Sequence, residues 1–125
     1  MIPKFRAWDK ILKKMNDVTA IDFSTKPFRV FYSAYGEDNY FNQDAILMQS
    51  TGLKDKNGVE IYEGDIVKPS SFASWIGVVK YSSESVAYIL DDNEITRSVN
   101  VYLSQFNGEF EILGNIYENP ELMEV

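Results

Sequence analysis

The chain has 125 residues, no cysteine and no histidine, and a formal net charge of -7 at pH 7. This length suits one domain, and 45% hydrophobic with 14% aromatic residues is typical of a folded chain. The missing residue types exclude disulfides, thiolate and imidazole catalysis and the usual zinc and copper sites, so any metal site would need carboxylates.

The first segment of the chain fits two structures. Residues 2–8 and 14–23 contain β-branched and aromatic residues that predict an N-terminal β-hairpin. A helix that Asp9 could cap is the alternative for residues 9–15. Four apolar residues have its i, i+3, i+4, i+7 spacing: Trp8, Ile11, Leu12 and Met15. Composition alone favours the hairpin and the helix about equally.

Residues 24–45 are rich in aromatic residues but are interrupted by polar residues and Gly36. We expect a short strand at residues 28–32, followed by an irregular excursion. The aromatic residues of this segment are Phe28, Phe31, Tyr32, Tyr35, Tyr40 and Phe41.

Turn-forming residues then divide residues 51–68 into short apolar runs. Asn57-Gly58 is the pair that most readily adopts positive φ at successive positions, so it predicts a tight hairpin between Leu53 and residues 59–61. A second break follows around Gly64, and β-branched residues then begin a strand.

Further strands are expected at residues 77–81, 86–90 and 99–103. Together with residues 66–67 they have the strand density of a small barrel. A last short strand at residues 111–113 precedes a sequence with the helix-opening order of cap, proline and acid: Asn119, Pro120 and Glu121.

Three motifs of this chain resemble the YopX family of small phage and prophage proteins, whose function is unassigned. They cover residues 4–9, residues 47–67 and residues 112–122. The turn and motif residues within them are Gly52, Asp55, Asn57, Gly58, Tyr62, Glu63, Gly64, Asp65, Gly114, Asn115, Asn119 and Pro120. The resemblance implies a mostly β protein whose central part is similar to an SH3-like barrel, and it implies no activity.

The expected fold is therefore mainly β. Residues 1–45 form an N-terminal hairpin and irregular extension, and residues 46–125 form an SH3-like barrel with at most one short C-terminal helical turn. The two parts are expected to make one compact unit.

Two carboxylate clusters are candidates for chemistry. Residues 91–94 read Asp-Asp-Asn-Glu and could hold a hard divalent cation, but Asp and Asn between two strands ordinarily build a turn. Glu60, Glu63 and Asp65 could supply a glycosidase-type acid and base, but they also suit local turn hydrogen bonds. We expect no enzyme, no metal and no cofactor.

The charge is uneven along the chain. Residues 1–30 have seven Lys or Arg and three Asp, a balance of +4, which leaves -11 for the remaining residues. The basic segment could dock a second copy or a nucleic acid, or it could simply be a solvated face. Because residues 46–125 hold five bases against thirteen acids, nucleic acid is disfavoured.

The expected function is that of a cytoplasmic phage accessory protein that binds protein, either itself as a homo-oligomer or a host factor. The candidate interface residues are Phe72 and Trp75, an aromatic pair in a small polar loop, and the basic residues Lys4, Arg6, Lys13 and Lys14. The alternatives are a nucleic-acid role, by edge binding or by acidic DNA mimicry, and a carboxylate-metal enzyme. No apolar run approaches the roughly 20 residues that span a bilayer, so no membrane partner is expected.

Overall fold

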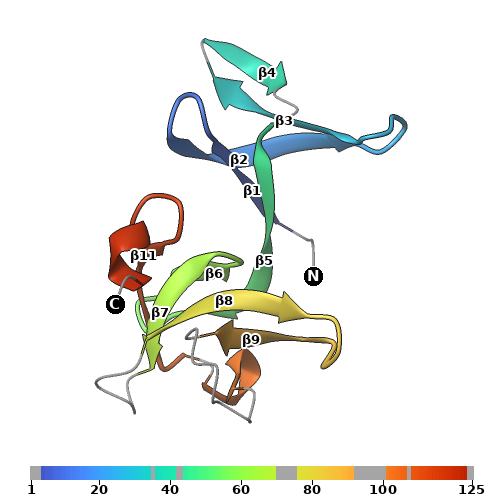
Figure 1. The fold of residues 1–125 in the computed structure, drawn as a ribbon. Coiled ribbons are helices and arrows are strands. Elements are labelled where there is room, and N and C mark those ends of the chain that lie inside the picture. Colours follow the sequence, from blue (N-terminus) through green and yellow to red (C-terminus); the bar gives the residue numbers. More distant parts are fainter. Residues whose placement is uncertain are drawn as a thin grey trace. The chain divides into compact units, whose positions relative to one another are not determined.

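The computed structural model describes residues 4–34, 36–41, 44–69, 76–91, 101–106 and 108–123. Antiparallel strands dominate these residues, and a mainly β fold is confirmed (Figure 1). The chain divides into two compact units, Met1–Gln49 and Ser50–Val125, whereas the division expected from the sequence lies between residues 45 and 46. None of the helical segments in the described ranges is long and apolar enough to cross a membrane.

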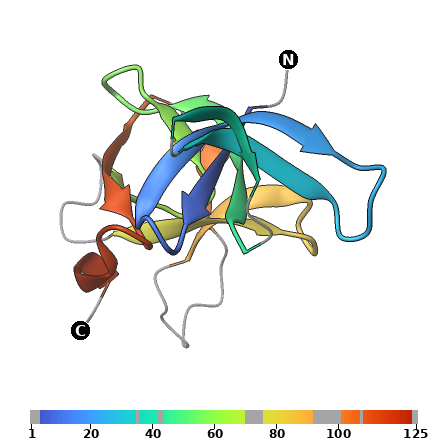
Figure 2. The same cartoon turned by 90° about the horizontal axis from the view of Figure 1, so that it is seen from above.

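The first unit is one antiparallel sheet with strand order β4-β3-β2-β1-β5. Its strands are β1 (Phe5–Asp9), β2 (Lys14–Asp22), β3 (Arg29–Ala34), β4 (Glu37–Phe41) and the first residues of β5 (Ile46–Lys54). Figure 2 shows β2 and β3 as two long strands joined by the turn of residues 23–28. The strand β4 therefore lies at one edge of this sheet.

The structure decides between hairpin and helix for residues 9–15 in favour of the hairpin. The Asp9 carboxylate accepts the backbone N–H groups of Ile11 and Leu12, each at 2.9 Å, and Lys13 completes the turn at a φ of 52°. Asp9 also accepts the Tyr32 hydroxyl at 2.8 Å inside the unit. The Asp9 carboxylate would cap a helix with the same hydrogen bonds, and it is the pairing of β2 with β1 that makes this segment a hairpin turn.

The irregular excursion expected after Tyr32 is wrong, because the chain forms a second hairpin there. Gly36 has a φ of 76°, which lets a tight turn connect β3 to β4. Phe31 then lies opposite Phe41 and Tyr32 lies opposite Tyr40. These cross-strand aromatic pairs supply the packing that the local composition did not reveal.

The core of the first unit lies on one face of its sheet. Ala7 and Tyr32 are fully buried and Val30 is 6% exposed. The side chains packed against them are those of Val18, Ala34, Tyr40, Ala45 and Leu47.

The second unit contains a five-stranded antiparallel sheet with strand order β10-β9-β8-β7-β11. Its elements are β6 (Glu60–Tyr62), β7 (Asp65–Pro69), β8 (Gly77–Ser82), β9 (Ala87–Asp91), β10 (Val101–Tyr102) and β11 (Phe110–Asn115), with the 3-10 turns η1 (Leu103–Phe106) and η2 (Pro120–Met123). The strand β6 pairs with the end of β5. In the described ranges this sheet is open, with no closed barrel.

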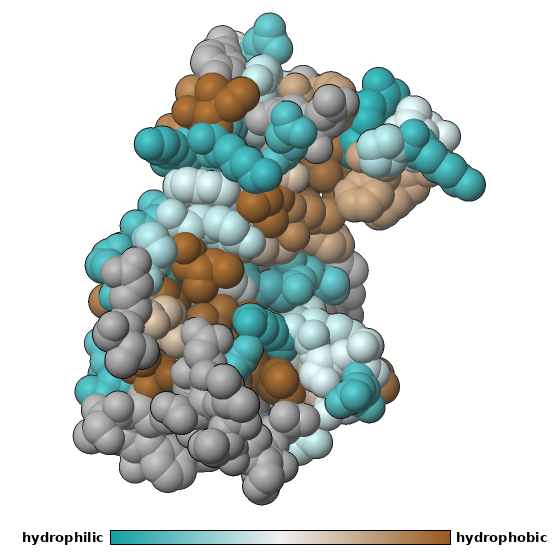
Figure 3. Space-filling model, in the orientation of Figure 1, coloured by the Kyte–Doolittle hydropathy of each residue, from teal (hydrophilic) through white to brown (hydrophobic). Residues whose placement is uncertain are grey.

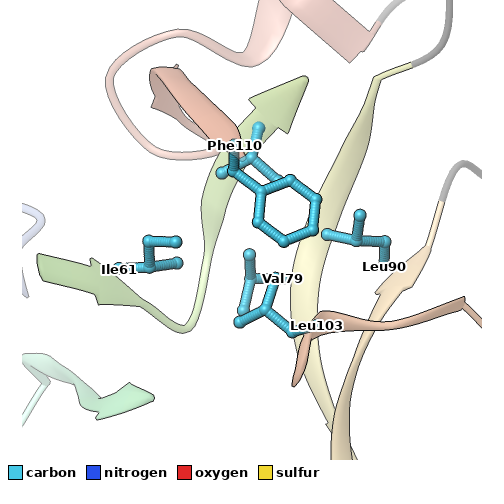
Figure 4. Close-up of a cluster of buried hydrophobic side chains, with 6 residues drawn as sticks. Ile61, Val79, Leu90, Leu103 and Phe110 are labelled. Atoms are coloured by element: carbon cyan, nitrogen blue, oxygen red, sulfur yellow. The ribbon is translucent and has the colours of Figure 1, made fainter. Parts of the chain in front are cut away.

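One cluster of apolar side chains forms the core of the second unit (Figure 4). Phe110 and Leu103 have no exposed surface, and the Phe110 ring points toward Val79 and Leu90. Burying one such side chain is worth about 1.5–3 kcal/mol. The remaining members are Ile61 and Val67, with Leu53, Tyr88 and Ile112 packed against them.

Candidate functional site

The central motif builds a turn around one buried carboxylate. Asp55 is 5% exposed, and its Oδ1 accepts the N–H groups of Asn57 and Val59, each at 2.9 Å. The Gly58 N–H donates to the Asp55 carbonyl at 3.1 Å. The other carboxylate oxygen accepts the Ile112 N–H at 3.4 Å, which ties the turn to β11. Both carboxylate oxygens of Asp55 thus accept backbone N–H groups.

The turn between β6 and β7 is also built around a buried carboxylate. Asp65 is 2% exposed and accepts the Tyr62 N–H at 2.8 Å. The Gly64 N–H donates to the Val79 carbonyl at 2.9 Å, and its own carbonyl accepts the Ile116 N–H at 3.0 Å. The turn between β6 and β7 is therefore fastened to β8 and to the C-terminal segment.

The closing motif folds the C-terminal segment onto β11. The Asn115 side-chain oxygen accepts the N–H groups of Tyr117 at 3.0 Å and Glu118 at 2.8 Å. The Asn119 side chain returns to accept the Asn115 N–H at 3.2 Å. A Cβ at Gly114 would overlap the Asn119 side chain, so this close approach requires glycine. The turn η2 starts directly after Asn119.

The other motif positions also belong to local structure. Gly52 lies within β5 and donates its N–H to the Ser50 hydroxyl at 3.1 Å. Glu60 lies in β6 opposite Lys54, and Glu63 lies in the turn between β6 and β7. The motif therefore encodes turns and the contacts that hold them.

The carboxylate cluster of residues 91–94 is only partly within the described residues. Asp91 ends β9 and forms an ion pair with Lys80 at 2.7 Å, and residues 92–94 lie outside the described ranges. Across the part of the chain that the structure describes, no three Asp or Glu side chains gather in a way that could hold a metal ion.

The predicted interface residues do not form one cluster. Phe72 and Trp75 lie outside the described residues. Lys4 is exposed just before β1, whereas Lys13 and Lys14 are exposed beyond its other end, roughly 15 Å away for an extended strand. Arg6 is partly buried within β1, opposite Asp17 and Met48.

The structure instead places two phenylalanine pairs and one arginine around strands β2, β3 and β4 of the first unit, and we call these five residues the phenylalanine surface. Its members are Phe23, Phe28, Arg29, Phe31 and Phe41. Phe23 is 72% exposed, Phe28 45% and Phe41 39%, while Phe31 is partly buried. The ring centroids of Phe23 and Phe28 are 5.6 Å apart, and those of Phe31 and Phe41 are 5.7 Å apart.

Strand register places three members of this surface, Arg29, Phe31 and Phe41, on one face of the sheet. Phe31 lies opposite Ala20 on one side and Phe41 on the other, and Arg29 lies opposite Asp22 in the next row. Because side chains alternate along a strand, the intervening residues point to the buried core on the opposite face. Figure 3 shows brown apolar surface between teal polar side chains on this unit.

Arg29 is held within the phenylalanine surface from two sides. Its guanidinium carbon lies 5.8 Å from the centroid of the Phe31 ring and 5.9 Å from that of Phe41, which is cation–π distance. Its Nη2 forms an ion pair with Asp22 at 2.8 Å.

The Asp22 carboxylate that anchors Arg29 is itself held in the charged state. The hydroxyl and backbone N–H of Ser24 donate to it at 2.6 and 2.9 Å. These hydrogen bonds first, and then Arg29, lower the pKa of Asp22 from 3.8 to about 2. Arg29 is thus a cation held beside the rings of Phe31 and Phe41 by an ionised carboxylate.

The aromatic residues of this segment are evident in the sequence, but their exposure is not. The signal that was present is the alternation of Arg29, Val30, Phe31 and Tyr32 along a strand. Because the β3–β4 turn was not predicted, the sequence did not show that Phe41 lies beside this strand.

Comparison with known proteins adds a family and a solved structure. The family model described as YopX protein matches residues 4–124. The crystal structure of protein EF1440 from Enterococcus faecalis is similar, with 31% sequence identity, a TM-score of 0.67 and 99% of each chain covered. None of the curated proteins matches the chain.

Proposed function

Because the chain belongs to the YopX family, we propose that it is a phage or prophage accessory protein of the bacterial cytoplasm that acts without catalysis, by binding another protein. The single observation that carries this proposal is the phenylalanine surface, in which Phe23, Phe28 and Phe41 are between 39% and 72% exposed and Arg29 lies over the rings of Phe31 and Phe41. The partner is either a second copy or a host protein.

The composition of this surface favours a protein partner. Aromatic residues and arginine are enriched at the centres of protein interfaces and dominate their energetics. Burying one phenylalanine side chain is worth about 1.5–3 kcal/mol, whereas micromolar affinity corresponds to about 8 kcal/mol. Covering two or three of these rings would therefore supply much of a specific interaction.

Arg29 adds directional hydrogen-bond donors to this apolar surface. Its ion pair with Asp22 and its stacking on two rings fix the guanidinium, so less side-chain entropy is lost on binding. A guanidinium has five N–H donors, and the bond to Asp22 involves Nη2, so a partner carboxylate or carbonyl can share the group.

The use of the buried polar groups supports a role without catalysis. Asp55, Asp65 and Asn115 accept backbone N–H groups of the turns in which they lie. A general acid or base must instead reach a substrate proton.

Affinity capture with matched variants tests the proposal. Tagged wild-type protein, Phe23→Ser/Phe28→Ser and Val59→Ser would each be incubated with bacterial host lysate and untagged copies of the wild-type chain. Val59 is the matched control, because it is 53% exposed on the other unit. Any retained protein would be identified, purified and titrated against all three variants by calorimetry.

We expect one stoichiometric protein to bind the wild type and Val59→Ser alike and to bind Phe23→Ser/Phe28→Ser at least tenfold more weakly. Retention of no protein, or equal binding to all three variants, would overturn the proposal. Circular dichroism would verify that each variant is folded.

A further inference from the structure

We propose that Asn57 is a site of spontaneous covalent modification, at which the asparagine converts to aspartate and isoaspartate, and that Asp55 restrains this conversion. The reaction needs only the chain and water. It is independent of the proposed function, because it takes place in the turn between β5 and β6 and not on the phenylalanine surface. The feature that carries it is an exposed Asn-Gly pair closed over the carboxylate of Asp55.

The chemistry follows from the covalent structure of the pair. The backbone nitrogen of Gly58 loses its proton and forms a bond to the side-chain carbonyl carbon of Asn57. The side-chain amide group then leaves as ammonia and takes up the proton that Gly58 lost. Water opens the resulting cyclic imide at either carbonyl. One opening gives aspartate, and the other gives isoaspartate, in which the main chain runs through the side-chain carboxyl carbon.

Both residues of the pair are accessible to this reaction. Asn57 and Gly58 are exposed, and among the described residues the Asn57 side chain has no hydrogen-bond partner. Gly58 has no side chain to shield its nitrogen, and a Cβ built at this position would meet no heavy atom within 4 Å. Water therefore reaches the reacting atoms, and no bond has to break before the Asn57 side chain turns toward the next nitrogen.

Three further asparagines of the chain lack one of these properties. Asn16 is 8% exposed and precedes an aspartate. Asn115 is 7% exposed, and its side-chain nitrogen donates to Glu118 at 2.9 Å. Asn119 precedes Pro120, which has no N–H to lose. The reaction is therefore directed to Asn57 in preference to these residues.

The closed turn hinders the attack through its geometry. The Gly58 N–H donates to the Asp55 carbonyl at 3.1 Å, and the Asp55 N–H donates to the Val59 carbonyl at 2.8 Å. Gly58 has a φ of 81° and Asn57 does not have a positive φ, which is the pattern of a type I turn followed by a glycine bulge. The Gly58 peptide plane must rotate toward the Asn57 side chain before attack, and this rotation breaks the Gly58 hydrogen bond. The reaction thus requires the turn to open.

The Asp55 carboxylate adds an electrostatic restraint. Its Oδ1 accepts the N–H groups of Asn57 and Val59, each at 2.9 Å, so a negative charge lies beside both neighbours of Gly58. The attacking nitrogen is itself negatively charged once it has lost its proton. A nearby like charge disfavours that anion. Asp55 therefore slows the reaction through its charge as well as through the turn that it closes.

Isoaspartate does not fit the closed turn. It adds one carbon to the main chain between Asp55 and Val59, so the hydrogen bonds that join the two ends of this loop cannot all be kept. The same carboxylate accepts the Ile112 N–H at 3.4 Å, and the Lys56 N–H donates to the carbonyl of the first residue of β11 at 2.8 Å. The modification therefore loosens both the turn and its attachment to β11.

The test follows the modification of the full chain over time. Wild type, Asp55→Asn, Asp55→Ala and Asp65→Asn would be incubated at pH 7.4 and 37 °C, digested at acidic pH, where the attacking anion is scarce, and mapped by mass spectrometry. Fragmentation distinguishes isoaspartate from aspartate, and the other Asn-Gly pair, residues 107–108, lies in a separate peptide. Asp65→Asn is the matched control, because Asp65 is a 2% exposed carboxylate that accepts the Tyr62 N–H in a different turn.

We expect conversion of Asn57 in the wild type and a rate at least threefold higher in Asp55→Asn, which keeps an acceptor oxygen for the turn but loses the charge. Asp55→Ala loses both and should convert faster still, whereas Asp65→Asn should convert at the wild-type rate. Hydrogen exchange at Lys56 and Ile112 should become faster as isoaspartate accumulates. Asp55→Asn keeps the test valid if Asp55→Ala fails to fold.

Three outcomes would overturn the inference. No conversion of Asn57 in any of the four proteins would show that this pair is not a modification site. Equal rates in wild type, Asp55→Asn and Asp55→Ala would remove the restraint assigned to Asp55. Equal acceleration by Asp65→Asn and Asp55→Asn would show that unfolding of the whole unit, and not opening of this turn, makes the pair reactive.

Discussion

At the scale of single residues, the pKa of Asp22 reports the contacts that hold Arg29 within the phenylalanine surface. Its pKa is lowered to about 2 by hydrogen bonds from Ser24 and then by Arg29. A group whose pKa is lower in the folded state stabilises the fold when it is ionised. This contribution is therefore present above about pH 4 and is lost as the pH falls toward 2.

We expect Ser24→Ala to raise the pKa of Asp22 toward 3.8, because the hydrogen bond from the Ser24 hydroxyl is the largest cause of its lowering, and we expect Arg29→Gln to raise it as well. Carboxyl carbon chemical shifts recorded from pH 1.5 to 6 would measure both changes. Thr25→Ala is the control, since the Thr25 hydroxyl donates to the Pro27 carbonyl and not to Asp22. A measured pKa near 3.8 for Asp22 in the wild type would contradict the hydrogen bonds from Ser24 and the ion pair with Arg29.

At the same scale, sequence identifies turn residues better than surface residues. Asp55-Lys56-Asn57-Gly58 has a turn chemistry that depends on neighbours in the chain, so its hairpin could be expected without a structure. The exposure of Phe23 and Phe41 depends on which strands pair, and that information lies far away in the sequence. Exposed aromatic residues were therefore inferred at Phe72 and Trp75 and missed in the first unit.

At the scale of elements, the turn of residues 55–59 shows how one side chain fixes two strands. Asp55 accepts two N–H groups of its own turn and one from β11, and the Lys56 N–H donates to the Phe110 carbonyl at 2.8 Å. Removing the carboxylate takes the acceptor from three partly buried N–H groups, and a donor left without a partner costs up to about 1–3 kcal/mol when it is buried.

We therefore expect Asp55→Ala to lower the free energy of unfolding by about 2–4 kcal/mol. Urea unfolding followed by circular dichroism would measure it. Lys56→Ala in the same turn is the matched control, because its ion pair with Glu111 is exposed and 3.5 Å long, and such pairs contribute about 0–1 kcal/mol. Equal losses in the two variants would show that the carboxylate does not hold the turn.

Other elements show where sequence patterns stop being informative. The strand pairs around Ser82 and Asn57 were predictable because alternation and turn residues agree there. Residues 9–15 satisfied helix and hairpin patterns alike, and the choice is made by the pairing of β2 with β1. The strand β4 was missed because its first three residues, Glu37, Asp38 and Asn39, have low strand propensity and the strand depends on pairing with β3.

At the scale of the whole molecule, the two units differ in net charge. Residues 1–49 carry seven bases and six acids, a balance of +1, and residues 50–125 carry five bases and thirteen acids, a balance of -8. Nucleic-acid affinity depends on how many phosphates a protein neutralises. The basic side chains near the N-terminus are spread along β1 and its turn, and the net charge of the chain is -7.

We therefore expect negligible binding to nucleic acid. In fluorescence anisotropy with a 20-nucleotide single strand and a 20-base-pair duplex, saturation should not occur below roughly 100 µM protein at 150 mM salt, the weak end of non-specific binding. Lys13→Glu/Lys14→Glu should behave like the wild type, because the exposed turn that holds these lysines is too small to neutralise many phosphates. Micromolar binding that weakens steeply between 50 and 200 mM salt and disappears in the double variant would contradict this prediction. It would show that the turn binds a polyanion even though residues 50–125 are strongly acidic.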